Sequence, residues 1–247
     1  MPMMTMVFVF VSMYFVCLTA ILFFHKYVDP KKMILIFTII DVVLFVGSWI
    51  NDFYRKGSFD FLTFDQISPF MFTMLPLSYL MKDKLRNIVY QTAALLSLGM
   101  LVAMLVSPLE AHLGSYHDKA SILYILDTLL HLNFSLFGIY LFISGTVKLE
   151  IKSVLSSAIF LHSVITFAVI CNFLFHKNYF GMGYYSNYGI YMIRIFETYW
   201  ATLIVYLLGV VLVLMLGYEY ALLLRKVNSH NLVEVTQPLE INQPTNN

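Results

Sequence analysis

The chain contains seven apolar runs, each long enough to cross about 30 Å of bilayer hydrocarbon as an α-helix. A helix is the structure expected for each run, because a segment in lipid must satisfy its own backbone hydrogen bonds. The runs cover residues 3–24, 33–50, 59–81, 88–106, 120–145, 154–175 and 198–224. We therefore expect an all-α fold, a polytopic transmembrane helical bundle of about seven helices. It forms one domain over residues 1–226, and the polar segment 227–247 is expected to be a disordered cytoplasmic tail.

Composition supports a membrane protein and limits its partners. The chain is 60% hydrophobic and 12% charged, whereas a soluble domain is about half apolar and about a quarter charged. The net charge is +1 and the sequence shows no basic stripe, so we expect no nucleic-acid partner. Membrane lipids are the expected partners, and the sequence leaves both a monomer and a homo-oligomer open.

The two cysteines, Cys17 and Cys171, lie inside apolar runs. Two residues so far apart provide neither a disulfide framework nor a cysteine-rich zinc site. The sequence also lacks the His-Glu-x-x-His pattern of zinc proteases. We therefore expect no metal site and no cofactor.

Lysine and arginine predict the orientation of the bundle, because short cytoplasmic loops carry an excess of both. Seven crossings put ten of these residues on one side and five on the other. We therefore expect a multi-pass protein of the cell membrane with its N-terminus outside and its C-terminus in the cytoplasm. The run at 59–81 is the weakest of the seven, and if it does not span, the helices before it invert relative to those after it.

Ionisable side chains inside the runs cost about 2.5–3.5 kcal/mol each near the bilayer centre, so they are candidates for function. Asp41 lies near the middle of the second run and could pair with His131 or His162. Asp65 and Gln66 precede Pro69 in the third run, where a proline-broken helix could form a polar binding site. An imperfect, partly exposed segment is the alternative for that region.

Asp127 and His131 are the strongest candidates for chemistry. Their spacing of four places both side chains on one face of a helix, within reach of each other. The Asp127 carboxylate could accept the proton of one imidazole nitrogen, which would fix the tautomer and leave the other nitrogen as a base. The alternative is a packing pair that is hydrogen-bonded within the bundle.

Further polar groups lie in or beside the sixth run. His162 is in its middle and Asn172 is near its end, just before a loop rich in tyrosine and glycine. That loop is either an aromatic belt at the membrane surface or a re-entrant lid over a cavity. The candidate substrate-binding residues are Asp65, Gln66, His162, Asn172, Asn178 and Tyr179.

Three stretches resemble the YwaF-like family of bacterial membrane proteins, which includes the eukaryotic transmembrane protein 164. They are the Leu-Pro-Leu run before a basic loop within residues 74–84, the Leu-Leu-His sequence that ends at His131, and Asn172 followed by Asn178-Tyr179. Together they cover about two-thirds of the chain in patches. The resemblance implies six or seven helices and, from the eukaryotic relative, acyl transfer between phospholipids by a cysteine with a histidine.

The family's histidine and cysteine in the third helix correspond to Gln66 and Ser68 in this chain. His131 matches the family pattern, so Ser68, His131 and Asp127 would make a formal Ser-His-Asp set. The sequence does not decide whether the chain is an enzyme. A lipid-modifying acyltransferase, a small-solute or proton-coupled transporter (or a substrate-binding membrane subunit), and a non-catalytic structural or regulatory membrane protein all remain open.

Overall fold

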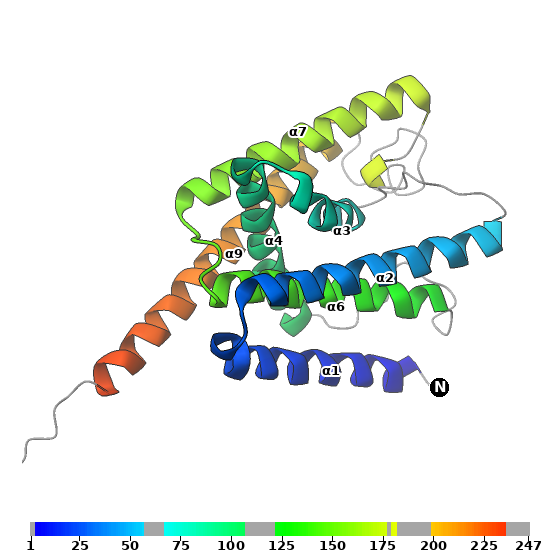
Figure 1. The fold of residues 1–247 in the computed structure, drawn as a ribbon. Helices are drawn as coiled ribbons and strands as arrows, with labels where there is room; N and C mark the ends of the chain where they lie inside the picture. Colours follow the sequence, from blue (N-terminus) through cyan, green and yellow to red (C-terminus); the bar gives the residue numbers. More distant parts are fainter. Residues whose placement is uncertain (1–2, 57–66, 107–121, 177–178, 182–198, 236–247) are drawn as a thin grey trace, which may run out of the picture.

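The computed structural model describes residues 3–56, 67–106, 122–176, 179–181 and 199–235. Within these residues the fold is all-α, as expected, with seven α-helices and no strand (Figure 1). The α-helices are α1 (Met3–Phe24), α2 (Pro30–Lys56), α3 (Ile67–Leu77), α4 (Asp83–Val106), α6 (Ile122–Ile143), α7 (Ile151–Phe175) and α9 (Tyr199–Val235). Short 3₁₀ turns lie at His25–Tyr27 (η1), Ser78–Leu80 (η2) and Tyr179–Gly181 (η3).

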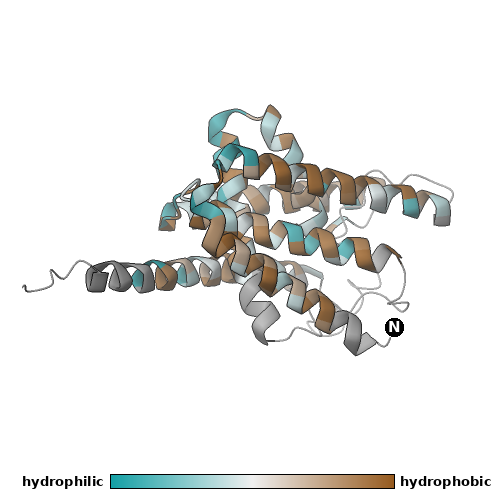
Figure 2. Ribbon diagram, turned by 60° about the horizontal axis from the view of Figure 1, so that its bottom comes forward, coloured by the Kyte–Doolittle hydropathy of each residue, from teal (hydrophilic) through white to brown (hydrophobic). Residues whose placement is uncertain are grey.

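Five of these helices are long and apolar enough to cross a membrane. These spans are Phe8–Tyr27, Pro30–Asn51, Ile125–Ile143, Ile151–Phe175 and Tyr199–Lys226. Their outer faces carry large apolar side chains such as Val43, Phe167 and Leu208, each more than 60% exposed. Figure 2 shows hydrophobic colouring along the helices and hydrophilic colouring gathered near their ends. This pattern is typical of helices solvated by lipid.

Helix α6 is the centre of the bundle. Of its apolar span 67% is buried, compared with 11% for the span of α1. It packs against α1, α2, α3 and α4, while α4 also packs against α7 and α9. The residues of α6 are therefore surrounded by protein on most sides, and this position brings its ionisable side chains inside the bundle.

The two ends of the bundle differ in charge. Phe37 of α2 packs against Tyr140 of α6 with 5.8 Å between ring centroids, so the α1–α2 turn lies at the same end as the α6–α7 loop. The Gln91 side chain of α4 donates to the Lys148 carbonyl at 3.2 Å, and Arg225 of α9 lies over the Phe142 ring. We call this the basic end, on the left of Figure 1. Its residues are Lys26, Lys31, Lys32, Lys82, Lys84, Arg86, Lys148, Lys152, Arg225 and Lys226.

The segment between α2 and α4 joins two helices that start at the same end of the bundle. Helix α2 starts at the basic end, and Gly47 lies beside Leu126, near the start of α6 at the opposite end. Helix α4 starts again at the basic end, where Gln91 contacts Lys148. Helices α2 and α4 therefore both start at the basic end, and α3 with η2 is the described part of the chain between them.

The described part of that segment is shorter than the expected helix at 59–81. Helix α3 has 11 residues, about 16 Å, and passes into the 3₁₀ turn η2 after Pro76. Pro69 lies in the first turn of α3, where a missing N–H costs no helical hydrogen bond, so it breaks no helix among the described residues.

Helix α9 differs from the expectation at its end. It continues to Val235 rather than ending near residue 224, and residues 236–247 of the expected tail lie outside the described residues. The apolar span of this helix ends at Lys226.

Candidate active site

Ser68 and His131 meet in the interior of the bundle, although they are 63 residues apart in the chain. The Ser68 hydroxyl lies 2.9 Å from Nε2 of His131. Ser68 is the second residue of α3, and His131 lies near the middle of α6. Because this contact joins two helices, it depends on how α3 is packed against α6.

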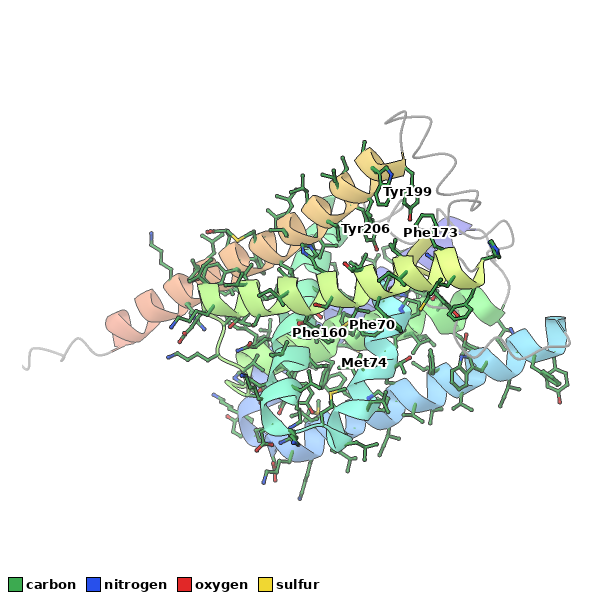
Figure 3. All side chains as sticks on the ribbon, turned by 90° about the horizontal axis from the view of Figure 1, so that it is seen from above. Phe70, Met74, Phe160, Phe173, Tyr199 and Tyr206 are labelled. Atoms are coloured by element: carbon green, nitrogen blue, oxygen red, sulfur yellow. The ribbon has the colours of Figure 1, made fainter. Side chains whose placement is uncertain are left out.

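Two aromatic residues on α3 fix that packing. Phe72 is buried against α6, with its ring 5.1 Å from the His131 ring in an edge-to-face arrangement and 5.7 Å from Phe134. Phe70 packs on the other side, 6.0 Å from Phe160 of α7 and 6.0 Å from Phe180 of η3 (Figure 3). Phe72 lies four residues after Ser68, so both reach the same neighbour from one helix face.

The hydrogen bonds of His131 specify its neutral tautomer. Nδ1 lies 2.8 Å from the backbone carbonyl oxygen of Asp127, and a carbonyl oxygen can only accept. Nδ1 therefore carries the proton and donates it. Nε2 is then the bare nitrogen, and it accepts the hydroxyl proton of Ser68.

The Asp127 carboxylate lies beside the same nitrogen. Its Oδ1 is 3.6 Å from Nδ1 of His131, which is too far for a hydrogen bond but within ion-pair range. When His131 gains a proton, this carboxylate is in position to stabilise the imidazolium. The set therefore has the arrangement of a nucleophile, a base and an acidic neighbour. The sequence predicted this set, and its catalytic roles remain predictions.

The site lies in the half of the bundle away from the basic end. His131 is about 13 Å along α6 from Ile122 at the opposite end, and about 18 Å from Ile143 at the basic end. The side chains of His131 and Asp127 are 17% and 34% exposed, so the set is sheltered but not sealed among the described residues.

His162 is not part of this set. Its Nε2 lies 3.1 Å from the Leu207 carbonyl oxygen of α9, so this nitrogen donates and ties α7 to α9. A hydrogen bond of this kind between transmembrane helices favours a packing role. The substrate-binding role predicted for His162 has no support from this geometry.

Asn172 and Tyr179 also have structural partners. The Asn172 side-chain amide donates to the Tyr179 carbonyl at 3.0 Å, and its oxygen accepts from the Tyr179 N–H at 2.7 Å. Between them His176 adopts a left-handed conformation that ends α7. The Asn172 side chain thus closes the turn after α7, which explains why an asparagine stands at that spacing from Tyr179.

The remaining predicted binding residues are Asp65, Gln66 and Asn178, and they lie outside the described residues. The tyrosine-rich loop falls outside them as well, apart from η3.

The surroundings of Asp41 contradict one prediction from the sequence. The sequence suggested that it pairs with His131 or His162, but both oxygens of this buried carboxyl lack a hydrogen-bond partner. His131 instead bonds to Ser68 and Asp127, and His162 bonds to Leu207. The physical reason is geometric: the side chain of His131 points along α6 towards Asp127 and across to α3, rather than towards α2.

Metal ligands do not gather in the described part of the chain. Within it, no group of three or more His, Cys, Asp or Glu side chains is arranged to hold a metal ion. No protein-family model, curated protein or solved structure matches the chain in comparisons of sequence and fold.

Proposed function

We propose that this chain is a multi-pass enzyme of the cell membrane that transfers acyl groups between lipids. Ser68 would be the nucleophile, His131 the general base and Asp127 the group that stabilises the imidazolium. The observation that carries the proposal is the 2.9 Å contact between Ser68 Oγ and a His131 nitrogen that must accept. Serine is a weak nucleophile unless such a base takes its proton.

The proposed reaction has two balanced steps. In the first, Ser68 Oγ attacks the ester carbonyl of a lipid and its proton moves to Nε2 of His131. The ester C–O bond then breaks, and the leaving alcohol takes that proton, which leaves an acyl-Ser68 ester. In the second step, the hydroxyl of a lysolipid attacks this ester, loses its proton to His131, and frees Ser68 as the proton returns to it.

Two further features support a lipid substrate. His131 and Asp127 lie within the candidate membrane span of α6, and the outer faces of α2, α7 and α9 are apolar, as lipid-facing surfaces are. The site is also nearer the opposite end than the basic end. If the basic end is cytoplasmic, with the N-terminus outside, the substrate comes from the outer leaflet.

The family resemblance fits the same proposal. YwaF-like relatives tend to have a cysteine where this chain has Ser68, and a serine can replace a thiolate only if a base is within reach. The contact with His131 provides that base. Membership in the family remains a proposal.

The test is acyl transfer by the purified protein reconstituted with acyl-labelled phospholipid and unlabelled lysolipid, followed by mass spectrometry. We expect transfer by the wild type and a loss of at least about 100-fold in Ser68→Ala and in His131→Ala. A fluorophosphonate probe should label Ser68 in the wild type and not in Ser68→Ala.

The control is Ser163→Ala, because Ser163 is exposed on α7 and bonds only within its own helix. Its activity should equal that of the wild type. Full activity of His131→Ala, or no transfer with any lipid class, would contradict the proposal.

A further inference from the structure

The Asp41 carboxyl is buried in the membrane without a partner. It lies near the middle of the span Pro30–Asn51, its exposure is 0%, and neither oxygen has a hydrogen-bond partner. The proposed acyl transfer does not use it. A group that costs this much to bury and supports no contact calls for its own explanation.

Among the described residues, the two helices that pack most extensively against α2 bring no free counter-charge to Asp41. They are α6 and α3. The ionisable side chains of α6, Asp127 and His131, face each other and Ser68, and α3 has no ionisable residue. An ionised Asp41 would therefore be buried without a hydrogen bond and without a counter-charge from the described residues, which is far more costly than the neutral acid.

Polar groups lie on both sides of Asp41 along α2, but on the basic side Thr38 and the Asn133 amide are already hydrogen-bonded to backbone carbonyls. Towards the opposite end, Ser48 lies two turns further along the same face, and Asn51 lies one turn beyond it. The amide nitrogen of Asn51 is also buried without a hydrogen-bond partner. Asp41 and Asn51 are about 15 Å apart along the helix with Ser48 between them, so proton exchange by this route requires a transient chain of several water molecules.

We propose that Asp41 is an intramembrane proton-binding site that exchanges with the opposite end of the bundle through Ser48 and Asn51. The O–H bond of the neutral acid breaks, the proton passes to water at that end, and the carboxylate is left; binding is the reverse. The site shares no residue with the Ser68–His131–Asp127 set, so a test of proton binding at Asp41 is independent of a test of acyl transfer.

Infrared spectroscopy of the reconstituted protein tests the site directly. The wild type should show the C=O stretching band of a protonated carboxyl at neutral pH. The band should weaken as the pH is raised and return when it is lowered. Asp41→Asn should lose the band and Asp127→Asn should keep it. A spectrum unchanged by Asp41→Asn, or a band that never responds to pH, would overturn the proposal.

Chemical labelling of carboxyl groups tests the site in the wild-type protein, so it does not depend on whether a variant folds. Dicyclohexylcarbodiimide partitions into lipid and reacts with protonated carboxyls, so peptide mapping of the treated wild type should find the adduct on Asp41. Less adduct is expected at high pH. Labelling that avoids Asp41 at every pH would count against the site.

The direction of access has its own matched pair of variants. Exchange of the Asp41 proton for deuterium should be slower in Asn51→Leu and unchanged in Thr38→Val, which alters the side facing the basic end. Slower exchange in Thr38→Val alone would overturn the proposed route.

Discussion

At the scale of single residues, a backbone carbonyl decides what His131 can do. In many Ser-His-Asp sets the carboxylate fixes the tautomer of the imidazole, and its loss leaves the wrong nitrogen protonated. Here the Asp127 carbonyl oxygen accepts from Nδ1 at 2.8 Å, while the Asp127 carboxylate is 3.6 Å away. The main chain therefore sets the tautomer, and the carboxylate contributes charge alone.

This division of roles predicts the effect of Asp127→Asn on acyl transfer. The variant keeps the carbonyl, so Nε2 of His131 stays bare and the base survives. Only the stabilisation of the imidazolium is lost, and we expect kcat to fall by about 10- to 100-fold, less than in His131→Ala. Label transfer by the two variants, measured side by side, checks this. An Asp127→Asn variant as inactive as His131→Ala would show that the carboxylate is needed for the tautomer.

Asn172 provides a second prediction at this scale. Its amide makes two hydrogen bonds to the backbone of Tyr179, and the residue is buried. Asn172→Ala leaves that N–H and carbonyl without partners, so we expect a loss of about 1–3 kcal/mol in stability. Thermal unfolding in detergent measures it. A melting curve equal to that of the wild type would mean that water replaces the amide.

At the scale of elements, α4, α6 and α9 approach each other through glycines. A methyl group on Gly138 of α6 would overlap Ser97 and the Ala93 carbonyl of α4. One on Gly217 of α9 would overlap the Leu95 carbonyl. Lipid provides no hydrophobic force between helices, so close backbone packing of this kind is a main source of their association.

Alanine at these two positions should therefore destabilise the bundle. We expect Gly138→Ala and Gly217→Ala each to lower stability by about 1–3 kcal/mol, measured as denaturant or thermal unfolding in detergent. Gly209 is the control, since a methyl group there would meet nothing within 4 Å. Gly209→Ala should leave stability unchanged or raise it by about 0.5–1 kcal/mol. Equal effects in all three variants would refute packing as the cause.

The helices could be predicted wherever they depend on a local pattern in the sequence. Apolar length located the spans, and the spacing of four placed Asp127 beside His131. The contact with Ser68 could not be derived from periodicity, because it depends on Phe72 and Phe70 wedging α3 between α6 and α7. Asp41 shows the same limit: its depth was clear from the sequence, but hydropathy does not say which way a neighbouring helix turns its polar face.

At the scale of the whole molecule, charge distinguishes the two ends. Lys148 accepts a hydrogen bond from Gln91 of α4 and pairs with Glu150 at 3.1 Å, and Arg225 of α9 lies over Phe142 near the end of α6. The hydrogen bond and the charge of Lys148 hold the pKa of the Glu150 carboxyl below its usual value, so this exposed carboxyl is ionised at neutral pH. A cluster of such charges is costly to move across a bilayer, so we propose that the basic end is the cytoplasmic one.

Cysteine labelling in cells tests that orientation. Cys17 and Cys171 are first replaced by serine or alanine. Thr146→Cys then reports on the exposed α6–α7 loop at the basic end, and Tyr54→Cys reports on the opposite end, where Tyr54 is 82% exposed. An impermeant maleimide should label Tyr54→Cys in intact cells, and Thr146→Cys only after the membrane is opened. The reverse pattern would place the basic end outside, and the substrate of Ser68 would then come from the inner leaflet.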